Sequence, residues 1–225
     1  FEHIEPALPE FRVVMWVHSL HAGATLDNRM RLQEIQFKSL LAKMSNHNLK
    51  RYKLNISDTV NEVNKATALA QLEELRSLNP GDCCLIYYFG PGGVSPDANA
   101  ICEPVFSDAD NQETTYTTVW QGLDDIPEDV HIFIIQDFIF SFNVNSPGFY
   151  KPRNKQLVVL ENLPDPSSSF DASLPPDCFF QEQLRSIIEK KGAKMRYSTL
   201  INQLHLRYYQ SGLQYKPVMK AFPSE

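Results

Sequence analysis

Short, largely apolar runs are the feature that most constrains how this chain can fold. Three of them cover residues 12–18, 83–89 and 131–135. Runs of this length without polar alternation are typical of strands buried on both faces of a parallel sheet. We expect loops after the last two, at residues 90–93 and 137–141. In such sheets the functional residues commonly lie in loops at the carboxyl ends of the strands.

Helical patterns alternate with these strands. Apolar residues at helical spacing predict helices over residues 29–44, 60–75, 119–126, 180–188 and 197–208. Further strands are expected over residues 50–56 and 156–161, and a short hairpin would fit around 101–106. The alternation predicts an α/β fold, a three-layer α/β/α sandwich with a mainly parallel central sheet.

All 225 residues are expected to form a single domain, since 43% of them are hydrophobic and can build one substantial core. Three parts are expected to lie outside the sandwich: an N-terminal extension (1–10), a long loop (90–116) and a linker-like loop (162–177). Asp177 is expected to cap the helix that follows it. The aspartates of the linker-like loop leave open whether it is cleaved. Because residue 1 is not methionine, we expect the chain to be a piece of a longer protein.

Charge and cysteine content argue against several functions. The formal net charge of -6 offers no basic field for nucleic acid or for an anionic membrane surface. The four cysteines show neither a CxxC pair nor a zinc-like spacing, so no metal is expected, and a reducing, cytoplasmic location is favoured. The glycine-rich residues 90–93 lack the following Lys-Ser/Thr of a P-loop, and no cofactor is expected.

The order of elements and the two strand ends resemble the caspase-like peptidases, and the metacaspase branch more than the animal caspases. In that family the third core strand ends in Ser-Gly-His-Gly and the fourth in Asp-x-Cys-x-Ser-Gly. Laid on this sequence, Gly92 falls on the histidine and Ile139 on the cysteine. Asp137 and Ser141 match the aspartate and the serine. The resemblance covers residues 11–221, and the shared order and spacing carry it.

The resemblance implies a degenerate catalytic site. A cysteine peptidase needs a thiolate nucleophile and an imidazole beside it, and neither Ile139 nor Gly92 supplies one. The expectation is therefore a pseudoenzyme, a caspase-like domain without catalytic residues that works as a protein-interaction, scaffold or regulatory module in signalling. It would pair with an active homologue or relay a signal within a larger protein. The sequence leaves the oligomeric state open.

Four residues are candidates for binding. In metacaspases the residue that matches Asp137 helps to hold a basic substrate side chain, so Asp137 would mark a vestigial pocket; a structural role is the alternative. Tyr208, Tyr209 and Tyr215 form an aromatic group suited to a partner surface, although core packing explains at least one of them. An edge strand is expected over residues 214–221, and Pro217 would interrupt its pairing.

Two other functions stay open at this point. One is a hydrolase with a relocated cysteine nucleophile, which would need Cys102 or Cys178 to be reactive. Cys83 and Cys84 lie at the opposite end of their strand and are expected to be core thiols. The other is a flavodoxin-like ligand-binding domain unrelated to the caspases.

Overall fold

The computed structural model describes residues 7–17, 24–47, 51–58, 60–61, 64–94, 103–107, 113–115, 122–143, 156–162, 179–192, 195–213 and 217–222. Its centre is a sheet in which six strands follow the order β2-β1-β4-β7-β8-β9. These strands are β1 (Glu10–Val17), β2 (Lys53–Ile56), β4 (Cys83–Val94), β7 (His131–Asn143), β8 (Leu157–Asn162) and β9 (Val218–Phe222). The first five in this order run parallel, and β9 runs antiparallel to β8.

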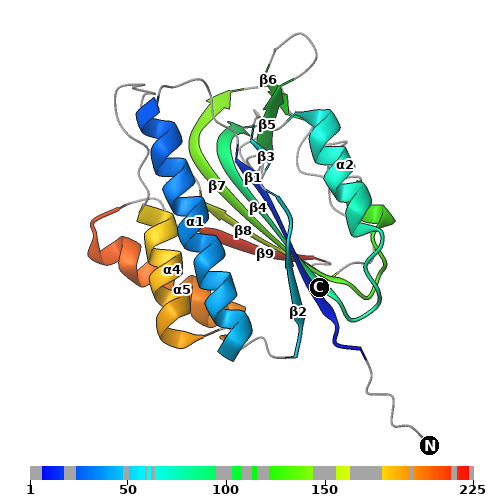
Figure 1. Ribbon diagram of the computed structural model, residues 1–225. Coiled ribbons are helices and arrows are strands. Elements are labelled where there is room, and N and C mark those ends of the chain that lie inside the picture. Colours follow the sequence, from blue (N-terminus) through cyan, green and yellow to red (C-terminus); the bar gives the residue numbers. More distant parts are fainter. Residues whose placement is uncertain are drawn as a thin grey trace, which may run out of the picture.

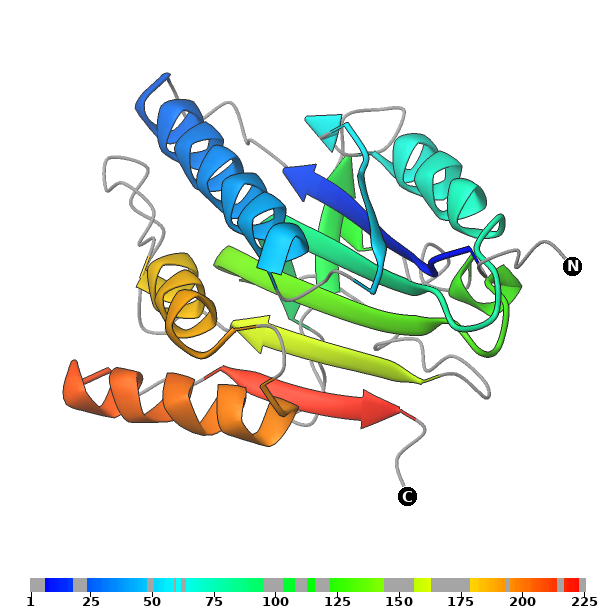
Figure 2. The same ribbon diagram turned by 60° about the horizontal axis from the view of Figure 1, so that its bottom comes forward.

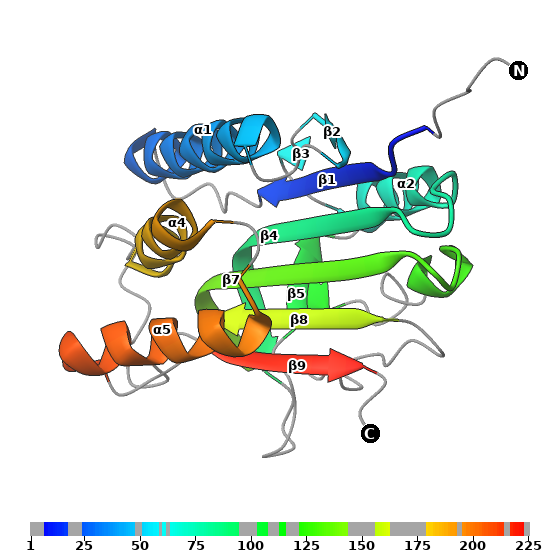
Figure 3. The ribbon, with the colours of Figure 1, turned by 90° about the horizontal axis from the view of Figure 1, so that it is seen from below.

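Helices cover both faces of this sheet, as Figures 1 and 3 show. One face carries α1 (Ala24–His47), α4 (Phe179–Lys191) and α5 (Tyr197–Gln210). The other carries α2 (Lys65–Leu75) and the short 3-10 helix η1 (Gly122–Asp125). The expected three-layer α/β/α sandwich is confirmed.

Alternation along the strands divides the core into two layers. Val14 and Trp16 of β1 pack toward α2, whereas Met15 and Val17 pack toward α1, α4 and α5. Trp16 is fully buried, and its indole N–H donates a 2.7 Å hydrogen bond to Gln71 of α2. Both faces of the central strands are therefore apolar, which is why these strands appear in the sequence as continuous apolar runs.

The second helix begins later than its apolar pattern predicts. Val60 and Asn61 form the short strand β3 (Val60–Asn61), which pairs with β1, and α2 starts only at Lys65. Asn64 caps it. The side-chain oxygen of Asn64 accepts a 2.9 Å hydrogen bond from the backbone amide of Thr67, and the backbone amide of Asn64 donates a 3.0 Å hydrogen bond to the Thr67 hydroxyl. This capping box fixes the start of the helix.

The expectation of loops at residues 90–93 and 137–141 is wrong. Strand β4 continues to Val94 and β7 to Asn143, and the two stay paired throughout, with a register shift between Gly90 and Gly92. A hairpin formed by β5 (Glu103–Ser107) and β6 (Glu113–Thr115) lies on the other side of β4, where Gly92 pairs with Pro104. Pairing on both sides overrides the turn signal of the glycines.

Other expectations divide between corrections and untested positions. Residues 122–125 form η1 instead of the expected longer helix, while 119–121 lie outside the described residues. Most of the 162–177 loop, including Asp177, also lies outside them. Pro217 precedes β9, so it does not interrupt the ladder. In the part of the chain that the structure describes, no helix is long and apolar enough to cross a membrane.

Candidate functional site

Gly92 and Ile139 lie on neighbouring strands near their carboxyl ends. Gly90 of β4 pairs with Phe138 of β7, and after the register shift Gly92 pairs with Ser141. Ile139 therefore lies two residues before the register partner of Gly92. The positions that the family resemblance assigns to the cysteine and the histidine are thus side by side. They hold no thiol and no imidazole.

Asp137 lies inside the molecule and not at an open site. Only 2% of the residue is exposed, and it points toward the helices α4 and α5. Its carboxylate accepts hydrogen bonds from Asn162 over 2.8 Å, from the Tyr87 hydroxyl over 3.4 Å and from the Gln181 amide. These three side chains surround the carboxylate, and the assignment of Asp137 to a vestigial pocket stays a prediction. Its structural alternative fits, with side-chain donors in the place of backbone amides.

The network around Asp137 reaches Tyr208 of α5. The Tyr208 hydroxyl donates a 2.8 Å hydrogen bond to the Asn162 side-chain oxygen, and its ring packs edge-on against Phe179, with 5.0 Å between centroids. Tyr208 is 5% exposed, so it is a tyrosine of the aromatic group whose position core packing explains. Buried polar groups of this kind need their partners, and here the polar groups join α5 to β7 and β8.

Two buried polar residues on the opposite face were missed from the sequence. Gln136 is fully buried and lies in register between Tyr88 of β4 and Glu161 of β8, itself 2% exposed. Within the described residues, both polar atoms of the Gln136 amide have no hydrogen-bond partner. A glutamine directly after the apolar run of residues 131–135 was the signal that could have identified this position.

The exposed side of α5 carries an apolar stripe. Leu206 is 48% exposed and Tyr209 75%, and their spacing of three residues places them on one helical face. Leu213, 38% exposed, follows the helix, which ends at Gln210. Figures 2 and 3 show that α5 lies beside the edge strand β9. The Nε2 atom of His205 donates a 2.7 Å hydrogen bond to the Pro217 carbonyl, which ties α5 to the start of that strand. Tyr215 lies outside the described residues.

The cysteines that the structure describes are poor nucleophiles. Burial raises the pKa of the Cys83 thiol above its usual 9.0; a hydrogen bond with Tyr52 opposes this rise, and the Asp82 carboxylate adds to it. Cys84 is 1% exposed. Neither forms a disulfide bond within the described residues, and Cys102 and Cys178 lie outside them. Among the residues that are described, no group of three or more His, Cys, Asp or Glu side chains could hold a metal ion.

Comparison with known proteins identifies the fold. No family model and no curated protein sequence matches the chain. Protein GSU0716 from Geobacter sulfurreducens superposes with a TM-score of 0.61 at 11% identity, over 96% of this chain and 95% of that one. Caspase-1 from Spodoptera frugiperda gives 0.54 at 12%, over 95% and 86% of the two chains. A structure described as pro-sf-caspase-1 gives 0.57 at 11%, over 98% and 96%.

The chain therefore has a caspase-like fold. The superpositions with the two caspase structures span 95–98% of this chain and 86–96% of the other chains. This likeness favours the caspase-like arrangement over an unrelated flavodoxin-like domain. At these identities it concerns the fold alone.

Proposed function

We propose that this caspase-like domain is catalytically inactive and acts by binding another protein. The exposed apolar stripe on α5, formed by Leu206 and Tyr209 and followed by Leu213 just beyond the helix, carries the proposal. Large apolar side chains that gather on one exposed helix face are typical of protein contacts, and tyrosine is enriched where binding energy concentrates.

The composition of the strand ends supports the inactive half of this proposal. Gly92 and Ile139 cannot form a thiolate or transfer a proton, and a peptidase of this type needs both. The backbone at Gly92 pairs with Ser141 on one side and Pro104 on the other. A strand paired on both sides leaves its backbone groups engaged, so they are not available to a peptide substrate.

The geometry of the α5 edge supports the binding half. The stripe belongs to a helix that is held firmly from within, since Tyr208 bonds to Asn162 and His205 to the Pro217 carbonyl. A surface on a rigid element loses little conformational entropy when a partner docks. The adjacent edge strand β9 carries Lys220, and a lysine on an edge strand discourages strand-to-strand association. We therefore assign the contact to the side chains of α5, not to the backbone of β9.

Enzymatic inactivity is tested with fluorogenic peptides that carry Arg, Lys or Asp at the cleavage position, together with a thiol-reactive peptide probe. We expect neither turnover nor specific labelling. Turnover that disappears in Cys102→Ser or Cys178→Ser would establish the relocated-nucleophile hypothesis instead.

Binding is tested by affinity capture from cells with matched baits. The double variant Leu206→Asp/Tyr209→Asp should lose the proteins that the unaltered domain retains. Ile35→Asp is the control, because Ile35 is 62% exposed on α1 and does not belong to the stripe. If all three baits retain the same proteins, the α5 stripe is not the contact surface.

A further inference from the structure

A cavity of about 480 Å³ lies between the sheet and the helical layer of α1, α4 and α5. It opens at the amino ends of the central strands, where Cys83 begins β4 and His131 begins β7. Gly92 and Ile139 lie toward the other ends of the same strands, so the cavity is a separate site. Ligand pockets for small molecules commonly enclose about 300–1,000 Å³, and this cavity falls within that range.

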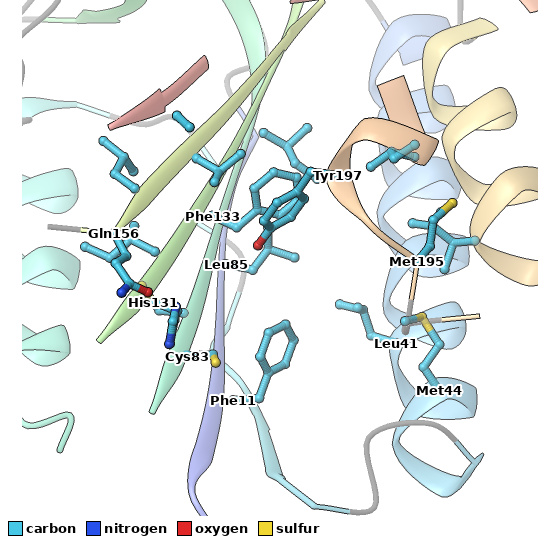
Figure 4. Close-up of a pocket in the computed structure, with 18 of the residues that line it drawn as sticks. Phe11, Leu41, Met44, Cys83, Leu85, His131, Phe133, Gln156, Met195 and Tyr197 are labelled. Carbon is cyan, nitrogen blue, oxygen red and sulfur yellow. The ribbon is translucent and has the colours of Figure 1, made fainter. Parts of the chain in front are cut away.

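The walls of the cavity are apolar and rich in rings. Four phenyl or phenol rings line it, together with the thioethers of two methionines: Phe11, Phe37, Phe133, Tyr197, Met44 and Met195. Figure 4 shows Phe133 and Tyr197 next to each other in the lining, with 5.4 Å between their ring centroids; Tyr197 is 50% exposed. Aromatic rings and thioether sulfurs both make favourable contacts with an aromatic ring.

None of the residues that line the cavity is Asp, Glu, Lys or Arg. A charged ligand would therefore lose its hydration without gaining a counter-charge. Burying even a neutral polar group without a hydrogen bond costs about 2–7 kcal/mol, and burying an unpaired charge costs more. The lining selects for a neutral molecule.

Hydrogen-bonding groups gather at one end. Figure 4 shows Cys83, His131 and Gln156 together at the strand ends, while Leu41, Met44 and Met195 lie on the side of the helices. His131 and Gln156 are exposed, so this end is the mouth. Burial, with the nearby Cys83 as a second cause, raises the pKa of the Tyr197 phenol above 10.0, and its hydroxyl stays a hydrogen-bond donor at neutral pH.

We propose that this cavity is a binding site for a neutral aromatic small molecule with one hydrogen-bonding group. The aromatic body lies between Phe133, Tyr197 and the methionines, and the polar group remains at the mouth beside His131 and Gln156. This goes beyond the proposed protein-binding role, since it concerns the opposite end of the strands and a different class of ligand.

The neutral probe N-phenyl-1-naphthylamine tests the proposal, because its fluorescence rises in an apolar environment. We expect saturable binding of one probe per chain. Its anionic analogue, 8-anilinonaphthalene-1-sulfonate, should bind at least about tenfold more weakly, a difference of about 1.4 kcal/mol. Equal affinity for the two probes would overturn the assignment to a neutral ligand, and absence of saturable binding would overturn the site.

Variants that fill the cavity locate the probe. Ile188→Trp and, as a second choice, Met44→Trp place a large ring in the lining and should lower probe affinity at least tenfold while the chain stays folded. Ile35→Trp is the matched control, since Ile35 is exposed on α1 and does not line the cavity. Folding is checked by circular dichroism and thermal melting, and two filling sites keep the test decisive if one variant unfolds.

Size-exclusion chromatography tests the alternative that a second copy of the chain occupies the cavity. The unaltered chain should elute at the same volume with and without the probe. If it elutes as a dimer that Ile188→Trp dissociates, the cavity holds a second copy of the chain and the small-molecule proposal falls.

Discussion

The side-chain amide of Asn162 donates a 2.8 Å hydrogen bond to the carboxylate of Asp137, its register partner on the neighbouring strand. Through its oxygen the same amide accepts a 2.8 Å hydrogen bond from Tyr208. One asparagine thus connects a buried carboxylate in the sheet to the last helix. The residue that family resemblance placed in a substrate pocket helps to hold the helical layer on the sheet.

Replacement of Asp137 by alanine should destabilise the domain strongly. Donors on the buried Tyr87 and Gln181 and on the half-buried Asn162 would lose the carboxylate that accepts from them. We expect a loss of about 3 kcal/mol in the free energy of unfolding, since each buried unsatisfied group costs about 1–3 kcal/mol. Urea denaturation measures it, with Tyr208→Phe as the mild control, which removes one hydroxyl at about 1 kcal/mol. An Asp137→Ala domain as stable as the unaltered one would show that the network contributes little.

The capping box of α2 gives a second prediction. Asn64→Ala removes the acceptor for the Thr67 amide and should cost about 1 kcal/mol of stability, while Asn64→Asp keeps a capping oxygen and should cost less. Thermal melting of the two variants side by side measures the difference. Equal losses would mean that the cap does not fix the start of the helix.

Protonation of Glu10 in acid should lower the stability of the domain. A hydrogen bond from Arg12 lowers the pKa of Glu10 below its ordinary 4.5, burial opposes this, and Asn55 adds a further hydrogen bond. Because the folded pKa is the lower one, the stabilisation is complete above the unfolded value and is lost as the pH falls through the folded value. Glu10→Gln should therefore lose less stability than the unaltered domain when the pH falls from neutral to below 4.5. Urea unfolding midpoints of both proteins, taken at neutral pH and at a pH below 4.5, measure this difference. If Glu10→Gln loses as much stability in acid as the unaltered domain, Glu10 does not contribute to the acid sensitivity.

Alkylation of the cysteines should be slow at Cys83 and Cys84. Burial holds the pKa of Cys83 above 9.0, and the thiolate is the reactive form, so labelling of Cys83 should rise only in alkaline solution. Cys84 should be labelled only on unfolding, because it is 1% exposed. Iodoacetamide labelling followed by peptide mass spectrometry measures each site. Rapid labelling of Cys83 at neutral pH would contradict the inferred burial effect.

The layered fold could be predicted because its core strands are continuous apolar runs with helical stripes between them. The ends of elements were less predictable. Residues 90–93 look like a turn, yet β4 continues through them because β5 and β7 pair with it on both sides. The apolar pattern that starts at Val60 looks helical, yet β3 pairs with β1 and Asn64 sets the true start of α2. In each case contacts distant in sequence outweigh the local signal.

The candidate site was predictable in position but not in environment. The sequence predicts Gly92 and Ile139 in loops at the ends of two strands, whereas the structure has both residues on the paired strands β4 and β7. Consecutive residues of a strand face opposite layers, but the sequence does not reveal that donors enclose Asp137 and that Gln136 lies beside Glu161. Nor does it reveal the cavity at the amino ends, because its lining comes from strands and helices that are separated along the chain.

The strand order has a consequence for synthesis on the ribosome. Starting from β1, β2 joins at one side and β4 at the other, after which β7, β8 and β9 attach in turn beyond β4. Along this six-strand path no later strand has to be threaded between two that are already paired. A nascent chain can therefore assemble the sheet by successive edge additions, from its N-terminal part onward. From β4 onward, each newly added strand is an exposed edge strand until the next strand pairs with it. Lys220 places a charge on β9, the last of these edge strands.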